Sequence, residues 1–293
     1  MKHRFDHSPY VVPHNESVKI GDFPTNDTNG IRDKKHAKDL IKEDIKTLAE
    51  AQNLLYAAAE RSVLIVLQAM DAAGKDSTIK HVMSGVNPQG CGVVSFKKPT
   101  SEELAHDFLW RCYKEVPAKG RITIFNRSYY EEVLVVKVHP EYLKPQKLPS
   151  REGKTTSIWE ERYEDINAFE HYLDRNGVKV IKFFLNVSKE EQKERFMERL
   201  NNPEKHWKFN PADVEERKHW DDYQQAYEDM LNATSTPWAP WYVIPADYKW
   251  FMRSLVADII VANVESMNLK FPEVSAKDKQ KLAQSRIDLD SEG

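Results

Sequence analysis

The residues best suited to chemistry lie between an apolar and a helical segment, at positions 69–78, which read AMDAAGKDST. Small side chains allow a tight turn, and glycine followed by lysine at a helix start is typical of loops whose backbone N–H groups bind phosphate. The loop departs twice from G-x-x-x-x-G-K-[ST], since Ala69 replaces the first glycine and Asp76 follows Lys75. Ser77 or Thr78 can supply the hydroxyl one position later. We expect Lys75 to be catalytic, and we expect the phosphate contacts to be Ala72, Ala73, Gly74, Lys75, Asp76 and Ser77.

Asp71 lies inside this loop although a carboxylate repels phosphate. The repulsion is removed when a cation lies between the two groups, and Mg²⁺ prefers carboxylate, phosphate and water oxygens as ligands. We therefore predict that Asp71 holds Mg²⁺ and is catalytic. The alternative is a structural aspartate that hydrogen-bonds to the backbone of its own turn.

Two more candidates, Asn126 and Arg127, end the apolar segment at 120–126. Ligands of an open parallel sheet collect beyond the carboxyl ends of its strands, so both side chains should reach the same site. Arg127 can bind a phosphoryl group during transfer through its planar guanidinium, and Asn126 offers a metal a neutral oxygen. The alternative for Arg127 is a structural ion pair with Glu131 or Glu132. These two glutamates either assist at the site or interact with the dipole of the helix that begins there.

Charged residues concentrate in a helical region at about 190–220, which the sequence NNPEKHWKFNPAD interrupts. We interpret this region as a helical lid over the sheet edge. A row of basic side chains there would attract a polyanion and neutralise transition-state charge. The alternative is a solvated helix face, because Glu191 and Arg195 form an i,i+4 pair. The candidate phosphate ligands are Arg195, Arg199, Lys205 and Lys208, and Arg199 is also a candidate catalytic residue.

Apolar runs that alternate with helical patterns predict the elements that position these residues. The predicted strands span 62–68, 91–98, 120–126, 177–188 and 238–247. The predicted helices include a long amphipathic one at 31–60 and another at 101–115. Strands that alternate with helices form a parallel sheet covered on both faces. We expect an irregular arm at 1–30 and a single α/β domain at 31–293.

The composition narrows the functional classes. The 293 residues carry a net charge of −3, which argues against binding nucleic acid through overall positive charge, although a local basic groove can still form. We find no apolar leader segment and no run able to span a bilayer. Cys91 and Cys112 lack a partner motif and fit reduced thiols. We predict a cytoplasmic protein with no nucleic-acid or membrane partner.

Three segments, at 71–81, 125–135 and 201–230, resemble the signature regions of the family-2 polyphosphate kinases, and of the class III subgroup in particular. Their sequences here are DAAGKDSTIKH, FNRSYYEEVLV and NNPEKHWKFNPAD…HWDDYQQAYEDM. The resemblance implies a P-loop kinase fold related to thymidylate kinase, with a five-stranded parallel sheet and a helical lid. It also implies Mg²⁺-dependent phosphoryl transfer between inorganic polyphosphate and nucleotides. Other members carry aspartate where Asn126 stands, which puts the usual metal ligand in question.

The resemblance further implies that an acidic residue of the lid region reaches the metal, and we choose Asp221. We assign Asp213 differently, because Asp213 followed by Glu216 fits a capping box at a helix start. None of the ten histidines has a metal-ligand spacing. We therefore expect direct in-line transfer, which needs only positioning and electrostatics.

The sequence thus predicts a reversible polyphosphate:nucleotide phosphotransferase that converts purine nucleoside mono- and diphosphates such as AMP and ADP to ADP and ATP. One alternative is an ATP-dependent nucleoside monophosphate kinase, which shares the loop, the sheet and the basic lid. Another is a non-catalytic nucleotide or polyphosphate sensor, although Arg127 and the lid arginines argue against it. We expect a homo-oligomer, and the sequence leaves base preference and direction of flux open.

Overall fold

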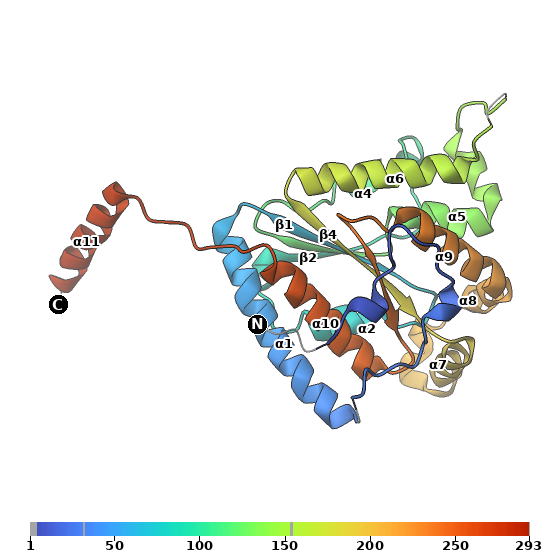
Figure 1. Cartoon of the computed structure of the whole chain (residues 1–293), viewed down its shortest axis with the longest axis horizontal. Coiled ribbons are helices and arrows are strands. Elements are labelled where there is room, and N and C mark those ends of the chain that lie inside the picture. The colour runs from blue at the N-terminus through green and yellow to red at the C-terminus, as the bar shows by residue number, and fades with distance from the viewer. Residues whose placement is uncertain (1–4, 32, 153–154, 293) are drawn as a thin grey trace.

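The computed structural model describes residues 5–31, 33–152 and 155–292. Its centre is a sheet of five parallel strands in the order β2-β3-β1-β4-β5 (Figure 1). The strands are β1 (Ser62–Gln68), β2 (Cys91–Ser95), β3 (Ile122–Asn126), β4 (Val178–Asn186) and β5 (Trp241–Pro245). All of β1 is buried, which explains its apolar sequence, because the central strand of a parallel sheet meets side chains on both faces. The predicted five-stranded parallel sheet is confirmed.

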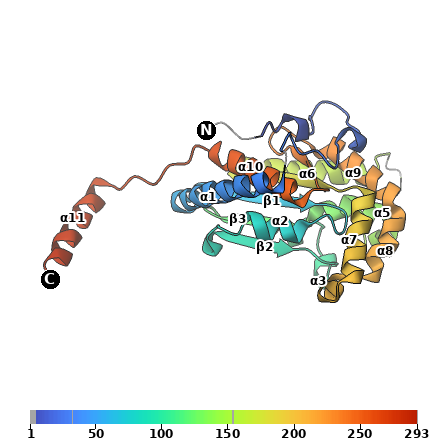
Figure 2. The same ribbon diagram turned by 90° about the horizontal axis from the view of Figure 1, so that it is seen from below.

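Helices cover both faces of the sheet, as the alternating pattern predicts. The longer ones are α1 (Lys34–Ala58), α2 (Lys75–Val82), α6 (Ile158–Arg175), α7 (Lys189–Asn201), α9 (Trp220–Thr234), α10 (Lys249–Glu265) and α11 (Ala276–Asp290). α10 packs against α1 and α2 on one face, and α6 packs against β4 and α9 on the other. α11 stands apart from the body in both views (Figures 1 and 2). Among the described residues, no helix combines the length and apolar composition needed to cross a membrane.

Short helices lie in the amino-terminal segment and in the connections between the longer elements. The α-helical ones are α3 (Ser101–Leu104), α4 (Trp110–Tyr113), α5 (Val135–Val138) and α8 (Pro211–Glu216). The 3₁₀ turns are η1 (Ser8–Tyr10), η2 (Ile20–Asp22), η3 (Pro88–Gly90), η4 (Tyr129–Val133), η5 (Pro140–Gln146), η6 (Pro203–Lys208) and η7 (Arg217–His219).

The single helix predicted at 101–115 is wrong, because the structure has α3 and α4 with a turn between them. α3 begins with a capping box in which Thr100 and Glu103 bond to each other's backbone N–H groups. The Asp107 carboxylate then accepts the N–H of Leu109 at 3.0 Å. Such a local turn competes with helical hydrogen bonding, and it interrupts the helix here.

The amino-terminal segment 5–31 lies against the edge of the sheet with little regular structure. Val11 forms an antiparallel bridge to Tyr242 of β5, and the N–H of Val12 donates to the carbonyl of Trp241 at 2.9 Å. The Phe5 ring packs edge-on against Phe251 of α10. The segment therefore covers the strand edge that β5 would otherwise expose.

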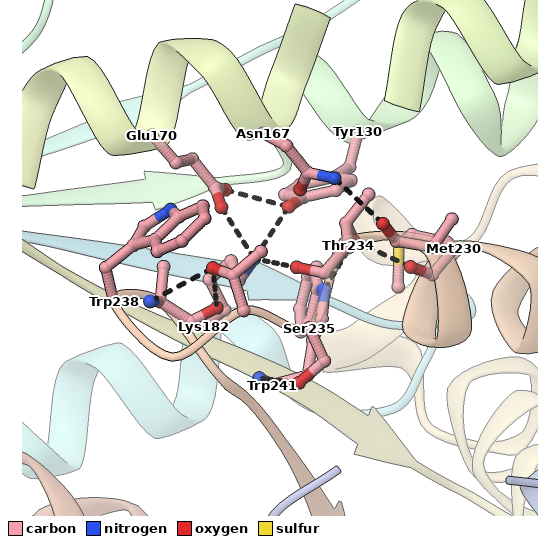
Figure 3. Close-up of polar contacts among 12 residues, drawn as sticks. Tyr130, Asn167, Glu170, Lys182, Met230, Thr234, Ser235, Trp238 and Trp241 are labelled. Atoms are coloured by element: carbon pink, nitrogen blue, oxygen red, sulfur yellow. Dashed lines mark hydrogen bonds and ion pairs between the residues drawn. The ribbon is translucent and has the colours of Figure 1, made fainter. Parts of the chain in front are cut away.

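A buried polar network joins β4, α6, η4 and α9 (Figure 3). Lys182 of β4 is fully buried, and its Nζ contacts Glu170 Oε2 at 2.6 Å, the Tyr130 hydroxyl at 2.9 Å and the Thr234 carbonyl at 2.7 Å. The Tyr129 and Tyr130 hydroxyls both donate to the other oxygen of Glu170, at 2.7 Å. Burial lowers the pKa of Lys182. The network fixes η4, which directly follows the residues that end β3.

We predict that Glu170→Gln lowers the free energy of unfolding by about 3–5 kcal/mol, because the Lys182 ammonium then stays buried without its counter-charge. Guanidinium denaturation measures the change. Glu164→Gln is the control, since Glu164 is exposed on the same helix and should shift stability by less than about 0.5 kcal/mol. Equal shifts in the two variants would show that the buried pair has no special role in stability.

Candidate active site

The loop between β1 and α2 has the geometry that phosphate binding requires. Ala72 has a φ of 60° and Gly74 a φ of 114°, so the chain enters the left-handed region twice before α2 begins. Glycine suits this position because residues that carry a Cβ rarely adopt a φ of 114°. A Cβ on Gly74 would also lie 3.2 Å from Met252 Cε. The first N–H groups of α2, from Lys75 on, have no acceptor one turn earlier within the helix. N–H groups without an acceptor at a helix start are the donors that anion sites use.

Five consecutive carbonyls of this loop, from Ala69 to Ala73, accept hydrogen bonds from side chains. Lys75 Nζ donates to the first two, at 2.8 and 3.4 Å. Gln192 Nε2 of α7 donates to the third at 2.9 Å, and Arg195 Nη1 donates to the last two at 3.0 and 2.6 Å. The N–H of Ala73, one of the predicted phosphate contacts, donates to the carbonyl of Met70 at 3.3 Å, so the other N–H groups of the loop are the ones left to offer an anion.

Arg195 lies beneath the loop, and its guanidinium does not extend over a bound chain as the sequence predicts. The side chain is buried, at 4% exposure. Besides the two loop carbonyls, its guanidinium donates to Glu191 at 2.7 Å and to the carbonyls of Ala246 and Asp247 at 2.6 and 3.1 Å. These bonds use all five N–H groups of the arginine. The prediction that Arg195 binds phosphate does not agree with these contacts, which show Arg195 holding the backbone of the loop in place.

Asp71 and Arg127 meet at the mouth of the loop. Arg127 Nη2 lies 2.9 Å from Asp71 Oδ1, and Arg127 Nη1 lies 3.6 Å from Glu131 Oε2. The negative charge of Glu131 raises the pKa of Arg127, and burial raises the pKa of Glu131 itself. Burial, reinforced by the nearby Arg127 charge, lowers the pKa of Lys75. The site therefore holds two cations and two carboxylates close together, and the ion pair to Glu131 expected as the structural alternative for Arg127 coexists with the contact to Asp71.

The remaining loop candidates surround the start of α2. Asn126 Nδ2 donates to Asp76 Oδ1 at 2.6 Å, which leaves the amide oxygen of Asn126 as the atom able to bind a metal. The Ser77 and Thr78 hydroxyls both donate to the carbonyl of Gly74, at 2.9 and 3.1 Å. The contact between Asn126 and Asp76 agrees with the prediction that the end of β3 lies close to the loop.

Asp213 is one of two acidic residues of the 190–220 region that line the cavity described below, the other being Glu216, and the capping role predicted for Asp213 is wrong. The N-cap of α8 is Asn210, whose side chain accepts the N–H of Ala212 at 3.1 Å. Asp213 instead lines this cavity and lies 3.4 Å from Arg199 Nη1. Burial and the nearby charge of Asp71 raise the pKa of Asp213 to about 6. Asp221, our predicted metal ligand, is exposed on α9 and does not line this cavity.

The three other predicted lid ligands lie outside the cavity wall. Arg199 also donates to the carbonyl of Lys208 at 3.3 Å, and its guanidinium lies over the ring of Phe196. Lys205 is paired with Glu198. Lys208 is exposed, with Nζ 4.9 Å from the centre of the Trp207 ring. In this structure these three basic side chains contact carboxylates, a backbone carbonyl or aromatic rings of the same region.

A cavity of about 470 Å³ opens between the loop, the end of β3 and the lid region. Its charged wall includes Lys97 and Lys98, which follow β2, together with Arg127 and Asp213. Its apolar wall includes Phe96 and Tyr142. Sequence reasoning missed the apolar wall, because its residues come from separate segments, among them the end of β2, η5 and α9, and no local pattern joins them. A volume of this size is typical of sites for small organic ligands.

The donor atoms at the loop fit a hard divalent cation. Within the described part of the chain, no three His, Cys, Asp or Glu side chains cluster as a complete metal site. Mg²⁺ at phosphate sites needs only one or two protein carboxylates, because phosphate and water complete its coordination. Asp71 at the loop supplies such a carboxylate, and Asn126 at the end of β3 supplies a neutral oxygen.

The fold and the site together define a P-loop phosphotransferase. The family model described as "Polyphosphate kinase 2 (PPK2)" matches residues 31–272. The chain is 46% identical over 280 residues to an ADP-polyphosphate phosphotransferase of Rhodopseudomonas palustris, covering 96% of this chain and 97% of that one. It is 49% identical to an AMP/ADP-polyphosphate phosphotransferase of Meiothermus ruber, covering 78% and 81% of the two chains.

A solved structure gives the same result. The crystal structure of polyphosphate kinase 2 from Arthrobacter aurescens matches with a TM-score of 0.83 and 36% identity, covering 94% of this chain and 95% of that one. The chain belongs to the polyphosphate kinase 2 family. The resemblance noted in the sequence, the P-loop kinase fold and the assignment as a kinase are thereby confirmed.

The raised pKa of Asp213 predicts a pH-dependent contribution to stability. Between its ordinary value of 3.8 and about 6, the folded protein binds more protons at this carboxyl than the unfolded chain does. Stability from this group is therefore lost as the pH rises through that window. The free energy of unfolding of Asp213→Asn should therefore rise relative to that of the wild type as the pH increases from about 4 to 6. Above about pH 6 the difference between the two proteins should stay constant. Thermal unfolding over this pH range measures it.

Asp221→Asn is measured in parallel as a control, because it replaces an exposed aspartate that does not line the cavity. A difference between Asp213→Asn and wild type that is the same at every pH would contradict the assignment.

Proposed function

We propose that the protein transfers a terminal phosphoryl group from inorganic polyphosphate to nucleoside mono- or diphosphates, with Mg²⁺ as the metal. One observation carries the proposal. The cavity of about 470 Å³ is lined by Ala69, Met70 and Asp71 of the loop, by charged side chains that include the basic residues Lys97, Lys98, Arg111 and Arg127, and by an apolar wall. The basic side chains suit phosphate groups, and the apolar wall suits the base of an acceptor nucleotide. The names of the R. palustris and M. ruber relatives support the same substrates.

The charged and polar groups around the loop take distinct roles in the proposed reaction. Lys75 donates to two carbonyls of its own loop, and the remaining N–H of its ammonium would donate to a phosphoryl oxygen of a bound substrate. The first N–H groups of α2 would hold the same oxygens. Arg127 would stabilise charge that develops on the transferring group. Asp71 and the Asn126 oxygen would hold Mg²⁺, which neutralises and orients the phosphates when bound.

The region at about 190–220 is proposed as the lid. Arg199, Lys205 and Lys208 lie outside the cavity wall, so closure would be needed to bring them to a polyphosphate chain. Asp213 already lines the cavity, and we propose it in place of Asp221 as the acidic lid residue nearest the metal. The homo-oligomeric assembly and the cytoplasmic location expected from the sequence stay predictions.

A donor panel tests the proposed reaction. The purified protein is incubated with Mg²⁺ and either polyphosphate plus ADP, polyphosphate plus AMP, or ATP plus AMP, and products are followed by ³¹P NMR. We expect ATP or ADP to form from polyphosphate. Phosphorylation of AMP by ATP with polyphosphate ignored would identify a nucleoside monophosphate kinase instead. Nucleotide binding without turnover in any mixture would identify a sensor, if the Lys75→Ala variant also still binds nucleotide.

Asp71→Asn tests the metal site. Loss of the carboxylate charge should lower kcat by about 100-fold and move the Mg²⁺ titration to higher concentration, because an interaction with transition-state charge is removed. Nucleotide affinity and stability should change little, since this side chain is partly exposed and packs little. Asp222→Asn, at an exposed position on α9, is the control. An unchanged Mg²⁺ titration in Asp71→Asn would count against the metal role.

A further inference from the structure

Asp247, in the turn between β5 and α10, connects the amino-terminal arm (residues 5–31) to α7. Its Oδ2 accepts the Thr25 hydroxyl at 2.7 Å, and its Oδ1 accepts the N–H of Ser188 at 2.8 Å. Its backbone N–H donates to the Thr25 carbonyl at 3.0 Å. Its own carbonyl accepts Arg195 Nη2 at 3.1 Å. The two oxygens of one carboxylate therefore hold the arm and the start of α7 together.

The start of α7 in turn determines where the arginine beneath the phosphate loop lies. Ser188 is the N-cap of α7, and its side chain accepts the N–H of Glu191 at 3.1 Å. Glu191 then binds Arg195 Nε at 2.7 Å, and Arg195 Nη1 holds the last two carbonyls of the loop. Every step from the arm to the loop is a directional hydrogen bond or ion pair, so a displacement at one end changes the geometry at the other.

We propose that Thr25 is a positioning residue for the phosphate loop, acting through Asp247 and Arg195. Its hydroxyl holds the Asp247 carboxylate in the orientation that also receives α7, and the loop carbonyls then stay turned away from the anion. The family model begins at residue 31, so this contact comes from a segment outside the matched region. The inference rests on the proposed function of the loop in binding phosphate.

Thr25 is well suited to such a role, because it supplies two contacts to one turn. Its carbonyl fixes the Asp247 backbone and its hydroxyl fixes the side chain. Valine has nearly the same shape as threonine and keeps the backbone contact, so Thr25→Val removes the side-chain contact alone. Thr25→Ser restores the hydroxyl. These two variants therefore separate the hydrogen bond from the packing of the arm.

Asn232→Ala is the matched control for docking of the arm in general. The Asn232 side chain of α9 bonds to both the N–H and the carbonyl of Val18, at 2.8 and 2.9 Å. The variant removes two hydrogen bonds between arm and body, more than Thr25→Val does, and leaves the contacts of Asp247 intact.

The experiment measures amide hydrogen exchange across residues 70–77 without substrate, and kcat and KM with polyphosphate and ADP. In Thr25→Val we expect faster exchange in the loop and a kcat lower by about tenfold, the effect of one lost hydrogen bond to a charged group, with the KM for ADP within about twofold. Thr25→Ser should behave as the wild type. Asn232→Ala should leave loop exchange and kcat unchanged, even if its melting temperature falls.

Two results would overturn the proposal. One is loop exchange in Thr25→Val that equals the wild type, and the other is an equal loss of kcat in Asn232→Ala and Thr25→Val. Faster loop exchange in Thr25→Val together with no phosphotransferase activity in any form, wild type included, would support the positioning role and contradict the proposed function alone.

Discussion

The orientation of five carbonyls between β1 and α2 is the constraint on which the site depends. A backbone loop carries donors and acceptors in equal number, and it binds an anion only when its N–H groups face the anion. Here three side chains, those of Lys75, Gln192 and Arg195, bind the carbonyls from residues 69 to 73. Two of the three come from α7, more than a hundred residues further along the chain. The phosphate loop is therefore completed by tertiary structure, and its local sequence supplies only part of it.

The same contacts connect the loop to the lid region. Gln192 holds the carbonyl of Asp71 and also accepts Arg217 Nη1 at 2.6 Å, so one side chain links the proposed metal ligand to η7. Asp213 adds a carboxylate from the lid side to the ions already paired at the loop. In this structure the cations of the site are balanced by carboxylates and carbonyls. A phosphate chain bound at the loop would compete with the carboxylates for these cations.

The sequence predicted the sheet, the loop and the convergence of Arg127 with Asp71, because apolar runs and loop chemistry are local signals. Predictions from the sequence were less accurate for residues whose role depends on which group the side chain contacts in the folded protein. Arg195 and Arg199 lie four residues apart on one helix, yet one binds backbone beneath the loop and the other lies beside Asp213. Helical spacing tells which face a residue occupies and says nothing of what that face meets. At the start of α8, Asn210 followed by proline was the stronger capping signal, and it would have freed Asp213 for the site.

Arg195 holds the loop carbonyls from behind, and we propose that the N–H groups of the loop and of α2 bind the phosphate. A crystal structure with an oligophosphate and Mg²⁺ bound would show both sets of contacts. We expect phosphate oxygens within hydrogen-bond distance of the first N–H groups of α2, with the Arg195 guanidinium still on the carbonyls of Ala72 and Ala73. A guanidinium that has left those carbonyls to contact the phosphate would show that Arg195 is a phosphate ligand instead.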